Sequence, residues 1–490
     1  MLVSYTEKNT ATELGSAVTD GEPPSSIAVA DPSAVDEPPS TARVAATDAH
    51  SHRVFRNDEF WKTIPSWSDL STEQFSDWKF QVRNSVTDFA GLVHLVGGIT
   101  DGAFLEDVRQ GILAAPMVIR LSPYILSLID WENPYDDPVR IQFLPVLSRK
   151  EPDHPMLRLD SLQERRDSPV HGLVHRYPGK VLFLTLDVCP VYCRFCTRSY
   201  AIGQNTGSVE KATIKASVDR WNRAFAYIAS HPDVEDVVIS GGDTYMLPPV
   251  QIRFIGQSLL AIPHVRRIRY ATKGIAVMPT KILTHHEWRE AIFHVTELGR
   301  KMSKEVCIHT HFNSTNEITD LTRQAADLLF QGGVKVRNQS VLIRGVNDDP
   351  ARLVKLISQL AWMNIQPYYV YQHDMVKGVE ELRTTVATNQ ELERRVRGSL
   401  AGFNTPLFVN DVPGGGGKRD VHSHDWYDRS TGVSIYRSPA VDSDAVYCYF
   451  DPLSRLDEIG RERWSRPEEH GRIIAEALEN AGLSHLRLTM

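Results

Sequence analysis

Three of the five cysteines lie within eight residues of one another, in the segment DVCPVYCRFCTRSY at positions 187–200. Thiolates are soft ligands that suit iron–sulfur clusters and zinc, so this cluster predicts a metal site. So few cysteines in 490 residues exclude a secreted disulfide framework and favour a reducing compartment. The clustered residues have the spacing C-x3-C-x2-C and are Cys189, Cys193 and Cys196.

Two interpretations of the cysteines remain open on spacing alone. A structural zinc site needs four ligands, and the sequence has no second CxxC, although His171 or His175 could supply the fourth. Three thiolates on a four-iron cluster would instead leave one iron open for catalysis.

A lysine follows four glycines in PGGGGK, residues 413–418. The segment is not a phosphate loop, because that pattern needs Gly at 412 and Ser or Thr at 419, where Val and Arg stand. Either the glycines form a flexible hinge, or they give the amine of Lys418 access to a bulky planar partner.

The elements that must position these residues are short β-rich runs, each followed by a longer amphipathic stretch. This alternation predicts βαβ units and a parallel sheet, with the fold class α/β and a full or partial β/α barrel. The polar motifs follow the runs, where a barrel has its active site. The predicted strands are 181–187, 234–240, 265–272, 305–311, 334–342 and 366–372.

The chain divides into four predicted parts. Residues 1–50 are an acidic tail, rich in Ala, Ser, Thr and Pro, that we expect to be disordered. Residues 51–165 are a helical region with a capping box at Ser71 and Gln74, which ends in a proline-broken, extended stretch over 130–145. The barrel core covers 166–375, and a C-terminal region covers 376–490, with a helical stretch over 453–482.

The net charge of −7 comes mostly from the first 50 residues, which carry −6. The nearly neutral remainder does not favour nucleic acid or an acidic membrane surface as a partner. The sequence shows neither a targeting signal nor an apolar run long enough to span a membrane, so we expect a cytoplasmic protein.

The motifs together resemble the lysine 2,3-aminomutase family of radical S-adenosylmethionine enzymes over about residues 70–420. The resemblance implies a partial (β/α)6-type barrel with an N-terminal helical extension and a C-terminal α/β extension. It rests on the stretch HGLVHRYPGKVLFLTLDVCPVYCRFCTR and on SGGD, THFNSTNEIT, NQSVLIRGVND, PYYVYQHD and VPGGGGK.

This resemblance implies a [4Fe-4S] cluster on the three cysteines and S-adenosylmethionine on its open iron, as the source of a 5′-deoxyadenosyl radical. It implies that Lys418 forms a Schiff base with pyridoxal 5′-phosphate. The residues implied to bind S-adenosylmethionine are Ser240, Gly241, Gly242, Asp243, Gln339 and Arg344. The residues implied at the pyridoxal phosphate are Arg176, Tyr177 and Lys180.

The resemblance also implies a substrate site for a cationic amino acid. Arg198 would bind the α-carboxylate as a bidentate pair, and Asp374 and Asp411 would grip the side-chain ammonium of L-lysine. The implied reaction moves the α-amino group of L-lysine to C3 to give L-β-lysine. Other implied features are an electron-donating reductase and a homo-oligomer.

Three alternatives remain. The substrate could be arginine or another cationic amino acid, since a guanidinium could use the same aspartates. The chain could be a radical enzyme that has lost the aminomutase reaction. From another class, it could be a zinc-stabilised binding protein on a catalytically dead barrel.

Overall fold

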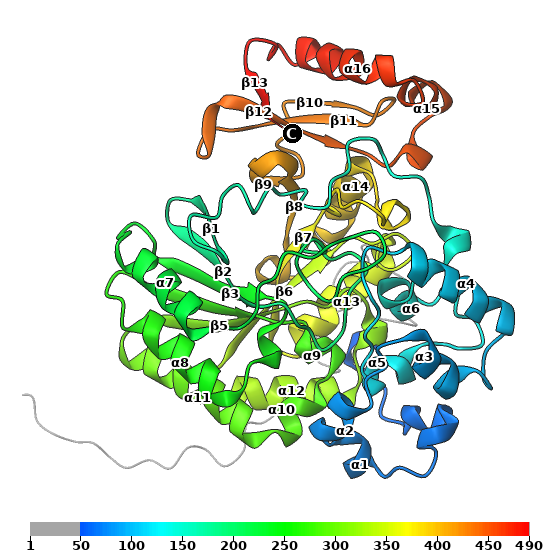
Figure 1. Ribbon diagram of the computed structural model, residues 1–490, viewed down its shortest axis with the longest axis vertical. Coiled ribbons are helices and arrows are strands. Elements are labelled where there is room, and N and C mark those ends of the chain that lie inside the picture. The colour runs from blue at the N-terminus through cyan, green and yellow to red at the C-terminus, as the bar shows by residue number, and fades with distance from the viewer. Residues whose placement is uncertain (1–49, 490) are drawn as a thin grey trace, which may run out of the picture. The chain divides into compact units, whose positions relative to one another are not determined.

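A computed structural model describes residues 50–489 of the chain. Its centre is a curved sheet of nine strands that follow one another in chain order (Figure 1). The pairings from β2 to β8 are parallel, and the two outermost pairings are antiparallel. The strands are β1 Leu173–Tyr177, β2 Lys180–Leu186, β3 Asp236–Gly241, β4 Arg267–Ala271, β5 Glu305–Thr310, β6 Lys335–Val341, β7 Ile365–Tyr371, β8 Leu407–Val412 and β9 Gly417–Asp420.

Helices follow the parallel strands, as a right-handed crossover between such strands requires. The predicted partial α/β barrel is confirmed, and all six predicted strands are present within two residues of their expected bounds. The six predicted strands do not include β1, β8 or β9, which extend the sheet at both edges. The helices of this part are α7 Val218–Ala229, α8 Pro249–Leu260, α9 Gly274–Val277, α10 Thr280–Thr284, α11 His286–Lys301, α12 Asp320–Gln331, α13 Pro350–Trp362 and α14 Val386–Val396.

Short helices make up the segment before the sheet. The predicted capping box is confirmed, because Ser71 Oγ accepts from the Gln74 amide at 3.2 Å and Gln74 Oε1 accepts from the Ser71 amide at 2.9 Å. The extended stretch expected over 130–145 is wrong in part. It contains a helix that Asp137 caps, with proline at the first helical position, where no amide hydrogen is needed. The helices are α1 Thr72–Ser76, α2 Trp78–Arg83, α3 Phe89–Val96, α4 Gly102–Ala114, α5 Pro123–Leu128 and α6 Pro138–Phe143.

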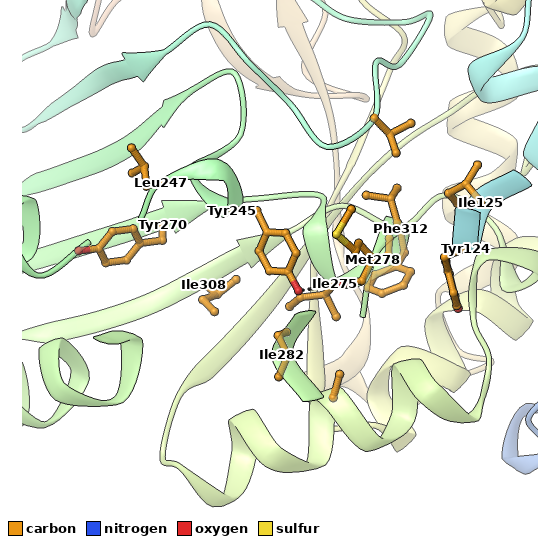
Figure 2. Packing of buried hydrophobic residues seen from close by; sticks show 14 of the residues in the cluster. Tyr124, Ile125, Tyr245, Leu247, Tyr270, Ile275, Met278, Ile282, Ile308 and Phe312 are labelled. Carbon is orange, nitrogen blue, oxygen red and sulfur yellow. Dashed lines mark hydrogen bonds between the residues drawn. The ribbon is translucent and has the colours of Figure 1, made fainter. Parts of the chain in front are cut away.

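Buried tyrosines join the layers of the main core (Figure 2). Tyr124 of α5 donates to the Glu317 carbonyl at 3.0 Å and thereby ties the N-terminal helices to the barrel. Tyr245 donates to the Met278 carbonyl at 2.9 Å, across the loops that follow β3 and β4. Each ring thus buries a large apolar area while its hydroxyl keeps a partner.

A second sheet forms the C-terminal extension, in the order β10–β11–β12–β13. The helical stretch expected over 453–482 is confirmed as two helices, which pack with this sheet (Figure 1). The elements are β10 Trp426–Asp428, β11 Val433–Ser438, β12 Asp442–Phe450, β13 Arg487–Thr489, α15 Glu458–Trp464 and α16 Pro467–Asn480.

This extension supports the segments that carry Asp374, Asp411 and Lys418. Tyr449 of β12 donates to the His373 carbonyl at 2.9 Å and accepts from Gln372 Nε2 at 3.0 Å. Tyr436 of β11 accepts from Asn410 Nδ2 at 3.2 Å. The ring of Tyr447 lies so close to Gly416 that a Cβ there would meet it at 2.6 Å. The extension therefore helps to shape the end of the barrel.

Within residues 50–489, no helix is both long and apolar enough to cross a bilayer. The predicted disordered tail, apart from His50, lies outside the described residues.

Replacing Tyr449 with phenylalanine should lower the free energy of unfolding by about 1–2 kcal/mol, because buried Gln372 loses a partner. The Tyr447→Phe variant on the same strand is the matched control, since no described residue hydrogen-bonds the Tyr447 hydroxyl. Urea unfolding of both variants checks this, and equal stabilities would contradict it.

Candidate active site

The cysteine loop begins where β2 ends, and α7 holds that end in place. Arg220 donates to the Leu184 carbonyl at 2.5 Å and to the Thr185 carbonyl at 2.7 Å. Trp221 Nε1 also donates to the Thr185 carbonyl, at 3.1 Å. Both side chains are buried, so these carbonyls keep partners where the parallel ladder stops.

The N-terminal helical region holds the other side of the loop. The Tyr192 amide donates to the Arg120 carbonyl at 3.1 Å, and the Arg194 amide donates to the Gln142 carbonyl at 3.0 Å. The Arg194 side chain forms a buried ion pair with Glu381. The loop therefore has fixed backbone contacts along its length.

All three cysteines line one cavity of about 650 Å³ inside the barrel. Burial raises the pKa of each thiol, to about 12 for Cys193. In residues 50–489, no three His, Cys, Asp or Glu side chains converge closely enough to hold one metal ion. Three thiols of one loop facing a common cavity fit a cluster that places each cysteine on its own iron.

The glycines after β3 approach the start of the cysteine loop closely. A Cβ on Gly241, whose φ is +119°, would meet the Leu186 carbonyl oxygen at 2.3 Å. A Cβ on Gly242 would meet the Val188 oxygen at 2.4 Å. These glycines therefore let two backbone segments meet, and both also line the cavity.

Asp243, the last residue of SGGD, is a buried structural acid in this structure. Its carboxylate accepts from the amides of Tyr245 and Lys273, both at 2.8 Å. It thus links the loops after β3 and β4, although it also lines the cavity.

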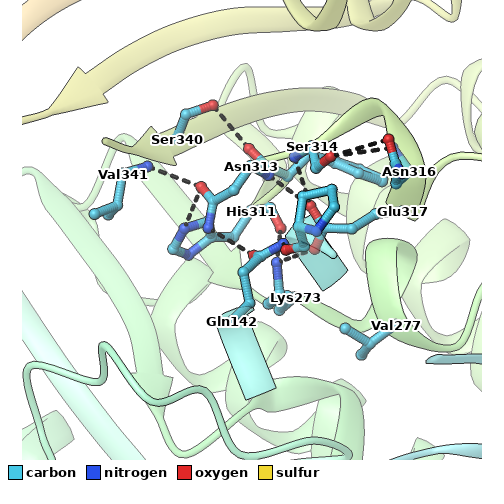
Figure 3. A network of polar contacts seen from close by, with 12 residues as sticks. Gln142, Lys273, Val277, His311, Asn313, Ser314, Asn316, Glu317, Ser340 and Val341 are labelled. Atoms are coloured by element: carbon cyan, nitrogen blue, oxygen red, sulfur yellow. Dashed lines mark hydrogen bonds and ion pairs between the residues drawn. The ribbon is translucent and has the colours of Figure 1, made fainter. Parts of the chain in front are cut away.

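Lys273 continues into the polar network that Figure 3 shows. Its ammonium donates to Glu317 Oε1 at 2.6 Å and to the His311 carbonyl at 2.8 Å. Glu317 Oε2 accepts from the Asn313 amide at 2.7 Å, and Asn313 Nδ2 donates to Gln142 Oε1 at 3.0 Å. The network therefore positions Lys273 and His311, both of which line the cavity.

Lys418 lies on β9 directly opposite Asp411 of β8, and the two side chains form an ion pair at 2.7 Å. Burial would lower the pKa of Lys418, but the Asp411 carboxylate raises it well above its usual range. Burial would raise the pKa of Asp411, but the charges of Lys418 and Arg176 lower it. The preceding glycine is required, because a Cβ on Gly417 would meet the Tyr177 hydroxyl at 2.2 Å.

Asp374 follows β7, and the charge of the nearby Asp411 carboxylate affects its pKa. Burial, and then the Asp411 carboxylate, raise the pKa of Asp374 to about 8. The Oδ1 atoms of Asp374 and Asp411 are both buried, and neither has a hydrogen-bond partner among the described residues. Unpaired buried carboxylate oxygens are costly, so these two mark a place for a donor.

Arg198 already holds a carboxylate in this structure. Its Nε and Nη2 donate to the two oxygens of Glu164 at 3.0 and 2.8 Å, and Tyr200 also donates to Glu164 at 3.0 Å. The bidentate edge that we assigned to the substrate is therefore taken by Glu164. Nη1 has no hydrogen-bond partner within residues 50–489 and remains for a further ligand.

The hairpin of β1 and β2 brings three further predicted residues to the cavity. Arg176 Nε donates to Asp167 at 2.7 Å and its Nη2 to the Leu162 carbonyl. Tyr177 accepts from the Lys418 amide at 3.0 Å, and the ammonium of Lys180 lies over the Tyr177 ring at 4.2 Å. Burial and the charge of Lys418 lower the pKa of Lys180 to about 8.

The barrel thus brings together almost all residues that the sequence singled out. Arg344 is the exception, since it does not line the cavity and instead donates to Glu151 at 2.7 Å. The predicted residues that line the cavity are Arg176, Tyr177, Lys180, Cys189, Cys193, Cys196, Arg198, Ser240, Gly241, Gly242, Asp243, Gln339, Asp374, Asp411 and Lys418.

Sequence reasoning missed Glu164 and Tyr371. Glu164 lies in an irregular segment without a motif, and no local pattern indicates its contact with Arg198. The Tyr371 hydroxyl donates to Gln339 Oε1 at 2.8 Å. The Lys418 ammonium lies over the Tyr371 ring, 5.5 Å from its centroid. Its position at the end of a predicted strand, beside two other tyrosines, was the available signal.

No protein-family model matches the chain. A curated L-lysine 2,3-aminomutase from Acetoanaerobium sticklandii is 38% identical, over 72% of this chain and 80% of the relative. Another, from Bacillus subtilis, is 34% identical, over 75% and 73%. A glutamate 2,3-aminomutase from Clostridioides difficile is 30% identical, over 71% and 76%.

Among solved structures, a radical SAM methyltransferase from Sphaerobacter thermophilus matches with a TM-score of 0.32 and 16% identity, over 49% of this chain and 68% of its own. That likeness is too weak to carry an argument. The curated relatives match this chain over most of both chains, and their family implies an iron–sulfur cluster, S-adenosylmethionine and an amino acid substrate. The chain therefore belongs to the lysine 2,3-aminomutase family of radical S-adenosylmethionine isomerases.

Proposed function

We propose that this aminomutase moves the α-amino group of L-lysine to C3, with pyridoxal phosphate on Lys418. One observation carries the choice of substrate. Asp374 and Asp411 both line the cavity that also contains the cysteine trio and Lys418, and each has a buried carboxylate oxygen without a hydrogen-bond partner among the described residues. An ammonium group would satisfy both oxygens, whereas the side-chain carboxylate of glutamate would be repelled.

The residues present fit the three cofactors. Cys189, Cys193 and Cys196 would hold the cluster, with S-adenosylmethionine beside Ser240–Asp243 and Gln339. The amine of Lys418 reaches the cavity beside the aromatic ring of Tyr371, as a planar cofactor requires. When bound, the cluster with S-adenosylmethionine supplies a carbon-centred radical, and pyridoxal phosphate supplies a ring that delocalises the unpaired electron. A one-electron donor protein must reduce the cluster.

The remaining residues orient the substrate. Arg198 would bind the α-carboxylate through Nη1, while Glu164 keeps the guanidinium in one orientation. Asp374 and Asp411 would bind the far end of the substrate, so the carbon that reacts is held between two charged anchors. The two aspartates are buried and Arg198 is half-buried, so water screens these contacts less than it would at the surface.

The test is anaerobic turnover of the reconstituted protein with lysine, arginine and glutamate in parallel, with products resolved by mass spectrometry. We expect β-lysine, and we expect Asp374→Asn to lower kcat/KM for lysine at least about tenfold, because a charge-assisted contact is lost. Asp444→Asn, at an exposed position of β12, is the matched control.

A β-arginine product would keep the reaction and change the substrate, since a guanidinium can also bridge two carboxylates. Turnover of glutamate, or unchanged lysine kinetics in Asp374→Asn, would contradict the role of the aspartate pair.

Asp374→Asn should also stabilise the substrate-free protein at neutral pH. The folded-state pKa of Asp374, about 8, lies above its unfolded value, so the folded protein binds the extra proton. Stability is therefore lost as the pH rises from about 4 to 8, and asparagine removes that loss. We expect a gain on the order of 1–3 kcal/mol at pH 7 and a smaller gain at pH 4. Thermal unfolding at both pH values checks this, and a pH-independent difference would contradict it.

A further inference from the structure

The inner face of the barrel carries charged residues near the N-terminal ends of β3 to β6, away from the C-terminal strand ends that lead into the cysteine loop and the SGGD motif. Alternate residues of a strand point to the same face, and on β3 to β6 this inward face begins with charged residues. Arg267 and Arg269 of β4 face the cavity between Asp236 of β3 and Glu305 of β5. Arg337 of β6, the next strand of the sheet, also lines the cavity. The cavity therefore extends from the cysteines to these five charged residues, and we call this part of it the polar chamber.

Cations outnumber carboxylates in this chamber. Arg269 donates through Nε to Asp236 Oδ1 at 2.7 Å, and Arg267 contacts the other oxygen of Asp236 at 3.4 Å. Glu305 is shared by Arg267 at 2.5 Å and Arg337 at 2.8 Å. Three arginines thus share two carboxylates, which leaves a positive surplus.

Two polar atoms in the chamber lack a partner. The Nη1 atom of Arg269 makes no hydrogen bond within residues 50–489, and this side chain is only 11% exposed. The Nε2 atom of His309 is buried and unpartnered, while its ring packs edge-on against Tyr368 at 5.4 Å. Burial and the charge of Arg269 lower the pKa of His309 to about 3, so the neutral ring can donate a proton in a hydrogen bond.

Lys180 lines the same cavity as the chamber residues and Lys418. Burial, and then the charges of Lys418 and Arg269, lower the pKa of Lys180. No ion pair joins Lys180 to a carboxylate in the described part of the chain. Arg176, in contrast, has Nε and Nη2 engaged by Asp167 and Leu162.

We propose that Arg269 and His309, together with Lys180, bind the phosphate group of the pyridoxal phosphate on Lys418. The proposal rests on the proposed function. A dianion would offset the surplus charge, satisfy Nη1 of Arg269 and accept from His309 Nε2. The resemblance assigned Arg176, Tyr177 and Lys180 to pyridoxal phosphate, and neither Arg269 nor His309 belongs to any motif quoted above.

The test compares pyridoxal phosphate with pyridoxal, which lacks only the phosphate. Binding to the full-length protein is measured from the visible absorbance of the Schiff base, without turnover. We expect Arg269→Gln to weaken pyridoxal phosphate binding about tenfold to a hundredfold and to leave pyridoxal binding unchanged. We expect His309→Phe, which keeps an aromatic ring against Tyr368, to weaken pyridoxal phosphate binding selectively as well.

Lys335→Gln is the matched control, because Lys335 also contacts Glu305 but is 69% exposed and does not line the cavity. Equal losses for both ligands in Arg269→Gln would mean a general distortion and would overturn the proposal. Unchanged binding of pyridoxal phosphate in Arg269→Gln would overturn it while leaving the role of Lys418 intact. Absence of a Schiff base in the wild-type protein, or its persistence in Lys418→Ala, would overturn the proposed function as well.

Discussion

The ion pair between Lys418 and Asp411 is the contact on which the rest of the site depends. The two side chains lie opposite each other on neighbouring strands and meet at 2.7 Å in a buried position. A buried lysine without a carboxylate would be costly, and so would two buried carboxylates without a cation. The pair leaves Asp374 as the acid without an ion-pair partner, and we propose that this acid receives a cationic ligand.

The surrounding fold keeps these charged groups in register. Antiparallel pairing of β8 and β9 places Lys418 beside Asp411, and the glycines allow β9 to pass the Tyr177 hydroxyl. Tyr436 and Tyr449 of the extension hold the neighbouring backbone, so a region outside the barrel sets the shape of its active end. The N-terminal helices do the same for the cysteine loop. Three parts of the chain thus converge on one cavity.

Hydrophobic alternation sufficed to predict six of the seven strands in the parallel ladder, β2 to β8. The motifs supplied the polar residues assigned to cofactors and substrate, and of these only Arg344 does not line the cavity. The resemblance implied a C-terminal α/β extension, but the individual strands β10 to β13 were not predicted. The pairing of β13 with β12 joins Ala445 to Arg487, far apart in the chain, and no local pattern indicates it. The contact of Glu164 with Arg198 joins residues 34 positions apart without a local pattern, so the occupied edge of Arg198 was missed. The close approach of Gly241 and Gly242 to the backbone of the cysteine loop was likewise not indicated by any local pattern. Whether the grouped residues act as assigned stays a prediction.

Proton release on lysine binding tests the central claim, that the aspartate pair receives the substrate ammonium, most directly. Calorimetry of the protein without pyridoxal phosphate at pH 7, in two buffers with different ionisation enthalpies, gives the number of protons exchanged. Asp374 is protonated in the substrate-free protein because its pKa is about 8, and an arriving ammonium favours its ionised form. The account predicts release of nearly one proton per lysine bound. Binding of lysine without proton release would contradict it.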